Sequence, residues 1–155
     1  MIRQNARESL VALGHPAVSP LSAALLESAS DQVRWEAAKA LGEIGDVQSI
    51  PALVKALSDN KFDVAWLVAV ALSNFRISAL TPLLQALLKE KWDFDLPRQR
   101  VHQVFVNQQE DGFNDLIANL IKALEAGNAK EAAMVAAFEI LERMKEEVEP
   151  NSQRQ

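Results

Sequence analysis

The sequence predicts an all-α fold, a right-handed α-solenoid of stacked antiparallel helical hairpins. The first observation is a repeat, because Pro20, Pro51 and Pro82 stand at an identical interval of 31 residues. The second is that apolar residues within each copy recur at helical spacing. A repeat of about 20 to 50 residues is typical of solenoids, in which each unit buries its apolar face only by stacking on the next.

Three copies of this unit cover residues 2–94 without a gap. Apolar residues occupy equivalent positions in all three copies: Ile2, Val33 and Val64; Ala6, Ala37 and Val68; Leu10, Leu41 and Leu72; Leu13, Ile44 and Phe75; and Leu26, Leu57 and Leu88. We therefore expect each copy to contribute the same inner face to one continuous core.

The second copy, residues 33–63, shows how the unit is built. Its first helix is predicted by apolar residues at helical spacing, namely Val33, Ala37, Ala40, Leu41 and Ile44. We expect Asp31 to be the N-cap of this helix and Gly45 its left-handed C-cap. A second helix follows, and Pro51 suits its first turn because the missing N–H is not needed there.

This second copy resembles the short HEAT repeats of the phycobilisome-lyase-like type. The shared pattern is Val-Arg at 33–34, Ala-Ala at 37–38, Ala-Leu-Gly at 40–42, Gly-Asp at 45–46 and Pro-x-Leu at 51–53. The match is strong in the second copy, partial in the first and third, and covers residues 2–94. The resemblance implies a HEAT-like superhelix that offers a surface to another macromolecule, and it implies binding far more than catalysis.

The two ends of the chain depart from the regular unit. The first copy carries Gln4 and Arg7 where the second has Trp35 and Ala38, and we expect these polar residues to cap the stack. After residue 94 the interval is lost, and helical spacing predicts helices from Pro97, over residues 113–125 and over residues 130–147. We expect a single domain over residues 1–148, with irregular helices at 95–148 and a disordered tail at 149–155.

The helix predicted at residues 63–75 has no charged face. The solvent side of the second copy carries Arg34, Glu36, Lys39 and Glu43, whereas the third copy has Ala65, Leu67, Val70 and Asn74 there. A helix that is apolar all round is normally buried all round. Either the C-terminal section covers this helix, or a partner does, including a second copy of the chain.

Two tryptophans occupy equivalent positions one repeat apart, Trp35 and Trp66. They either fill the gap between successive first helices or anchor a partner. The second helix of each repeat lines the inner face in HEAT-like solenoids, and here these helices carry further exposed charge. The candidate partner-binding residues are therefore Trp35, Trp66, Leu67, Val70, Lys55 and Lys89. Lys89 also begins a basic stretch with Lys91, Arg98 and Arg100. This stretch is either a solvated surface or a contact to an acidic partner or a phosphate.

Composition and charge narrow the classes of function. A formal net charge of −5 argues against general nucleic-acid binding. The chain has no cysteine, and His15 and His102 lack the spacing of metal ligands. No phosphate-binding loop or nucleophile motif is present. No apolar run approaches the roughly 20 residues that span a bilayer. We expect no catalytic residue, no metal, no cofactor and no membrane contact, in a cytoplasmic protein.

The predicted function is that of a non-enzymatic scaffold or adaptor that binds another protein. Self-association through the helix at 63–75 is one form of this prediction. A bilin lyase-like or phycobilisome-associated factor is the alternative that the resemblance implies. A nucleic-acid-binding HEAT solenoid is a second alternative, which requires a concentrated basic surface.

Overall fold

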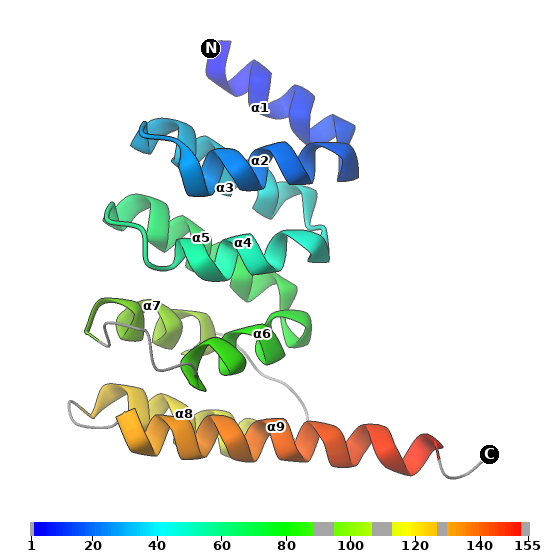
Figure 1. Ribbon diagram of the computed structural model, residues 1–155, viewed down its shortest axis with the longest axis vertical. Helices are drawn as coiled ribbons and strands as arrows, with labels where there is room; N and C mark the ends of the chain where they lie inside the picture. Colours follow the sequence, from blue (N-terminus) through cyan, green and yellow to red (C-terminus); the bar gives the residue numbers. More distant parts are fainter. Residues whose placement is uncertain (1, 89–94, 107–112, 127–129, 153–155) are drawn as a thin grey trace. The chain divides into compact units, whose positions relative to one another are not determined.

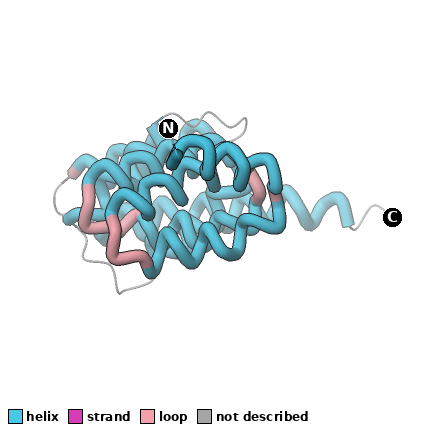
Figure 2. Tube along the Cα trace, turned by 90° about the horizontal axis from the view of Figure 1, so that it is seen from above, coloured by secondary structure: helices cyan, strands magenta, loops and turns pink. Residues whose placement is uncertain are grey.

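The computed structural model describes residues 2–88, 95–106, 113–126 and 130–152. These residues form nine α-helices and one short 3₁₀ helix, without a strand (Figure 1). Within residues 2–88, short loops join successive helices (Figure 2). The predicted all-α solenoid of helical hairpins is therefore confirmed.

The chain divides into two compact units, residues 1–82 and residues 83–155. The boundary falls inside the third repeat and not after it. In a solenoid each repeat contacts only its neighbours, so a stack of hairpins contains several places where few contacts cross. The single domain expected over residues 1–148 stays a prediction.

The first unit contains two layers of helices. Its elements are α1 (Ile2–Leu13), α2 (His15–Glu27), α3 (Asp31–Ile44), η1 (Val47–Ser49), α4 (Ile50–Ala56) and α5 (Phe62–Phe75), and α6 (Ile77–Leu88) crosses the boundary. Helix α3 contacts both α1 and α5, and α2 contacts α4. The hairpins α2–α3 and α4–α5 thus stack in succession, as Figure 1 shows.

The core of the first unit contains most of the predicted apolar residues of the second copy. The prediction was wrong for the first copy, where Ile2 is 87% exposed, Leu13 62% and Leu26 42%, because an end repeat has no neighbour on one side. Leu41, Leu53, Leu57 and Leu72 are fully buried. Small residues bring α3 and α5 close together, since a Cβ on Gly42 would lie only 3.1 Å from the Cβ of Ala71. Stacking of α3 on α5 therefore depends on small side chains where the two helices meet.

The ends of α3 are fixed by two different caps. The side chain of Ser30 accepts a hydrogen bond from the backbone N–H of Val33, so Ser30 is the N-cap and Asp31 is already helical. The expected N-cap at Asp31 was wrong by one residue, because the serine hydroxyl reaches this N–H first. Gly45 adopts the predicted left-handed conformation with φ of 67°.

The second helices begin at different points in the repeats. In the second repeat, residues 47–49 form the 3₁₀ turn η1, and Pro51 stands in the first turn of α4 as predicted. In the first and third repeats the helix starts earlier, so Pro20 and Pro82 lie inside α2 and α6. Equivalent prolines therefore do not mark equivalent helix starts.

Two further residues of the first two repeats, Arg7 and Val33, differ from their predicted environment. Arg7 was expected to face solvent as part of a cap, but its side chain is only 11% exposed and its Nη1 lies 2.6 Å from Glu36 Oε2 on α3. The charge is buried at the contact between repeats because a carboxylate on the neighbouring helix pairs with it. Val33, expected in the core, is 45% exposed, since α1 leaves the start of α3 uncovered.

The second unit contains α7 (Asp95–Val106), α8 (Asn114–Glu125) and α9 (Lys130–Ser152). Helix α8 contacts both α7 and α9. Apolar residues at helical spacing bury one side of each of these helices: Val101, Val104, Phe105, Leu116, Ile117, Leu120, Leu124, Ala133, Ala137 and Ile140. Leu141 and Met144 are half-buried.

The boundaries of the last helices differ from the prediction. Helix α7 starts at Asp95, two residues before Pro97, which is compatible with proline because the first turn needs no N–H donor at that place. Helix α9 continues to Ser152, so residues 149–152 are helical and not part of a disordered tail. Glutamates at 146, 147 and 149 are good helix formers, and they extend the helix beyond its packed part.

Candidate functional site

A row of exposed apolar side chains runs along α5. Phe62 is 65% exposed, Trp66 45% and Val70 40%, and their spacing of four residues places them on one face of the helix. We name these three residues the α5 ridge. Leu67 lies beside them and is half-buried. Such an exposed apolar face on a middle helix of a stack is typical of an interaction surface.

Aromatic contacts order this surface. The rings of Phe62 and Trp66 stack with centroids 6.1 Å apart and an interplanar angle of 23°. On the neighbouring helix α3, Trp35 is half-buried, and the Nζ of Lys39 lies 5.0 Å from its ring centroid. The equivalent tryptophans therefore differ, because Trp35 is partly covered by a lysine whereas Trp66 stacks on an exposed phenylalanine.

A hollow of about 430 Å³ opens between the starts of α3 and α5. We name it the aromatic hollow. It is lined by residues of both helices and of the loop before α5, namely Asp31, Gln32, Trp35, Lys61, Phe62, Asp63 and Val64. Phe62 belongs to the ridge as well as to the hollow, so the two form one continuous surface.

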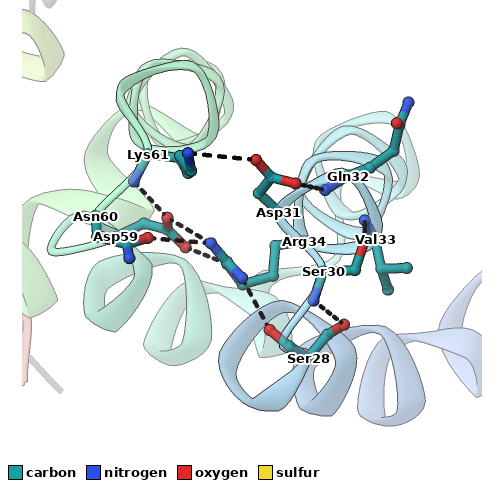
Figure 3. A network of polar contacts seen from close by, with 9 residues as sticks. All are labelled: Ser28, Ser30, Asp31, Gln32, Val33, Arg34, Asp59, Asn60 and Lys61. Carbon is teal, nitrogen blue, oxygen red and sulfur yellow. Dashed lines mark hydrogen bonds and ion pairs between the residues drawn. The ribbon is translucent and has the colours of Figure 1, made fainter.

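A polar network holds the two loops that frame the hollow (Figure 3). The guanidinium of Arg34 binds both carboxylate oxygens of Asp59, with distances of 2.7 Å from Nε and 3.2 Å from Nη2. Its Nη1 donates to the carbonyl of Ser28 at 2.9 Å, and its Nη2 also donates to Asn60. One side chain thus ties the end of α2 to the loop after α4.

The ion pair inside this network is largely withdrawn from water. The side chains of Arg34 and Asp59 are only 11% and 7% exposed. The hydrogen bond to Asp59 raises the pKa of the Arg34 guanidinium above its usual value, although burial acts in the opposite direction. Asp59 also accepts the backbone N–H of Lys61, so the network fixes the backbone on which the hollow is built.

A second ion pair crosses the mouth of the hollow. The Nζ of Lys61 lies 3.7 Å from Oδ2 of Asp31, and both side chains are more than half exposed. The other oxygen of Asp31 accepts the backbone N–H of Gln32. An exposed pair at this distance contributes little stability, and therefore it is easily rearranged.

The layer formed by α2 and α4 carries a different surface. Lys55 is exposed there and lines a hollow of about 400 Å³ together with His15. Nδ1 of His15 lies 2.5 Å from Oδ2 of Asp46, which links the first two repeats. The backbone N–H of Gln48 and the His15 side chain lower the pKa of Asp46. This surface is more polar than the α5 ridge.

The candidate residues from the sequence fall into three groups. Trp35, Trp66, Leu67 and Val70 come together on neighbouring parts of α3 and α5, whereas Lys55 lies in the other layer. Lys89 lies outside the described residues, as does Lys91. Arg100 is buried, so the expected basic stretch does not include it as a surface charge.

Two features of the ridge differ from the sequence reading. Ala65, expected on the solvent side, is fully buried, because α3 and α5 approach each other closely at small residues. Phe62 was not recognised as a site residue, although it is the most exposed member of the ridge. The available signal was that Phe62 stands one repeat interval after Asp31, where a polar residue precedes the same helix in the second copy.

In the described ranges, no group of three or more histidine, aspartate or glutamate side chains is placed to hold a metal ion. Among the helices that the structure describes, none is both long and apolar enough to cross a membrane.

The stacked hairpins define the class of α-solenoid proteins. A comparison with protein families matches HEAT repeats over residues 18–105, more than half of the chain. The chain therefore belongs to the HEAT-repeat family, whose members are generally protein-interaction scaffolds. No curated protein and no solved structure matches the chain. The phycobilisome-lyase-like subtype stays a prediction from the sequence.

Proposed function

We propose that this protein is a non-enzymatic adaptor that binds another protein through the α5 ridge and the aromatic hollow. The observation that carries the proposal is the row formed by Phe62, Trp66 and Val70, which exposes large apolar side chains on a helix of the regular stack. Aromatic residues are preferred anchors in protein interfaces because they bury much area at a small cost in conformational entropy.

The surroundings of the ridge support this choice of face. Arg34 and Asp59 hold the loops beside the hollow in a fixed geometry, so binding requires little reorganisation of the backbone. The equivalent helix α3 carries Lys39 and Glu43 on its outer side. The ridge is therefore a feature of one repeat and not a general property of the fold.

The test compares capture of partners by variants on the two layers. Trp66→Glu places a charge at the centre of the ridge, and we expect it to remove the captured partner, because a charge cannot be buried in an apolar contact without a large cost. Lys55→Glu changes the charge on the α2–α4 layer and serves as the matched control. Circular dichroism of both variants establishes that the fold is retained.

The outcomes separate the two faces and the two kinds of partner. Loss of capture with Lys55→Glu and retention with Trp66→Glu would overturn the assignment to the ridge and favour the α2–α4 layer. Sedimentation equilibrium of the purified protein identifies the case in which the partner is a second copy of the chain, since Trp66→Glu would then convert a dimer to a monomer.

A further inference from the structure

Two carboxylates line the aromatic hollow. Asp31 and Asp63 stand in the first turns of α3 and α5, and both line the hollow. Asp31 is engaged by Lys61 at 3.7 Å. The side chain of Asp63 is exposed. Within the described ranges, its carboxylate makes no ion pair or hydrogen bond.

Aromatic faces stand beside these carboxylates. Trp35 and Phe62 line the hollow, and Trp66 stacks on Phe62. The ring of Trp35 already attracts a cation of this chain, because the Nζ of Lys39 lies 5.0 Å from its centroid. The surface therefore has the two components that bind an organic cation, an aromatic face and a carboxylate.

We propose that the aromatic hollow receives an arginine side chain of the bound partner. A planar guanidinium stacks on aromatic rings and pairs with a carboxylate through two hydrogen bonds, which a lysine ammonium cannot reproduce. Asp63 is the acceptor, while Lys61 moves aside from its weak contact with Asp31. This inference rests on the proposed function, since it specifies the chemistry of the partner that lies on the α5 ridge.

An anionic ligand fits this hollow less well. The starts of α3 and α5 carry the positive ends of the helix dipoles, which by themselves attract anions. Asp31 and Asp63 place two negative charges there against the single positive charge of Lys61, and Asp31 already accepts the N–H of Gln32. The net charge of the whole chain, −5, adds to this preference for a basic partner.

The geometry of α5 also describes the partner segment. Phe62 and Val70 are eight residues apart, which corresponds to about 12 Å along a helix. A segment that covers the ridge therefore carries apolar side chains over about two helical turns and an arginine at the end that lies against Asp63.

The test is a titration of the full-length ¹⁵N-labelled protein with N-acetylarginine amide. We expect saturable NMR shifts of the Trp35 indole N–H and the Asp63 backbone N–H. The neutral isostere N-acetylcitrulline amide should bind at least about fivefold more weakly, because it keeps the shape but lacks the charge. Asp63→Asn should weaken arginine binding by about fivefold, whereas Glu27→Gln, which removes an equal exposed charge from α2, should leave it unchanged.

The outcomes distinguish this inference from the proposed function. Equal binding of arginine and citrulline amides, or shifts centred on other residues, would overturn the arginine site. A stronger effect of inorganic phosphate than of arginine would do the same and favour the helix N-termini. If arginine fails to bind while Trp66→Glu still abolishes partner capture, the adaptor function stands and only the partner chemistry is wrong. If arginine binds but Trp66→Glu leaves capture unchanged, the adaptor function through the ridge is wrong.

Discussion

Helices α3 and α5 occupy the same place in successive repeats, and each has 14 residues. Their inner faces agree, since Leu41 and Leu72 are both fully buried. Their outer faces do not, because α3 carries Lys39 and Glu43 where α5 carries Val70 and Asn74. The comparison teaches that stacking constrains one side of a repeat helix, whereas the other side is free to acquire a binding surface.

The two helices also differ at their ends, where α3 has favourable caps and α5 does not. Helix α3 begins with a serine side-chain cap and ends with a left-handed glycine. Helix α5 follows Lys61, which makes no side-chain cap, and ends at Arg76 with a positive φ of 53°. The helix with the exposed ridge therefore lacks the local devices that stabilise α3, and it depends more on its packed face.

The largest effect should come from the shared inner face. We expect Leu41→Ala and Leu72→Ala each to lower the free energy of unfolding by about 2–5 kcal/mol, the usual range for truncating a buried leucine. Urea denaturation followed by circular dichroism measures both losses. A cost below about 1 kcal/mol for either variant would show that the two helices do not share one core position.

The next-largest effect on stability should come from the polar network around Arg34 on α3, which has no equivalent on α5. Arg34→Ala leaves the carboxylate of Asp59 nearly buried without its partner, and we expect a loss of about 3 kcal/mol, near the lower end for breaking a buried pair. The double variant Arg34→Gln with Asp59→Asn removes both charges but keeps hydrogen-bonding groups.

Denaturation of the double variant separates the loss of the ion pair from the cost of leaving one charge buried without its partner. It should lose less stability than Arg34→Ala, because no uncompensated charge remains. If both proteins melt at the same temperature as the parent, the network contributes nothing to the stack. The aromatic hollow would then be shaped by apolar packing alone.

The inner faces were predictable from the sequence because the repeat interval is strict over residues 2–94. Leu41, Leu57 and Leu72 follow directly from that interval, and the left-handed Gly45 follows from its position after a helical stripe. Polar pairs were less accessible, since Arg34 and Asp59 are 25 positions apart within one repeat. No periodicity encodes such a pair.

The candidate site was predicted only in part for a related reason. Trp66, Leu67 and Val70 were recognised because they break the charge pattern of the preceding copy. Phe62 was missed because it lies just before the predicted helix at 63–75, and its exposure depends on where α5 begins. Helix starts are the least regular feature of this repeat, as α2, α4 and α6 also show.

A smaller effect should come from the end of α5. Arg76 adopts φ of 53° and ψ of −125°, close to the values of 69° and −130° at Gly14, which stands at the equivalent position two repeats earlier. This region is costly for residues with a side chain, so Arg76→Gly should raise the free energy of unfolding by about 1 kcal/mol after the greater chain entropy of glycine is included. Thermal melting should show a rise of a few degrees, whereas Gly45→Ala, at the left-handed end of α3, should lower it.

An unchanged or lower melting temperature for Arg76→Gly would contradict the account of α5 as the locally strained helix. It would mean that the contacts of the arginine side chain outweigh the cost of its backbone conformation. The contrast between the two helix ends would then have no energetic meaning, even though their conformations differ.

The smallest effect on stability should accompany the largest change of surface. Leu67→Glu with Val70→Lys gives α5 charges like those of α3, and we expect a loss of no more than about 1 kcal/mol, because Val70 is 40% exposed and Leu67 half-buried. The new glutamate and lysine are only three residues apart, which offsets part of the loss. Partner capture or self-association should nevertheless be abolished, since two charges now occupy the edge of the ridge.

Ala65→Arg is the opposite control: it places the charge of Arg34 at the equivalent, fully buried position, and it should lower the free energy of unfolding by several kcal/mol. If instead the double variant unfolds as readily as Ala65→Arg, the outer side of α5 is part of the core. The exposed face would then be a structural element and not the site of binding.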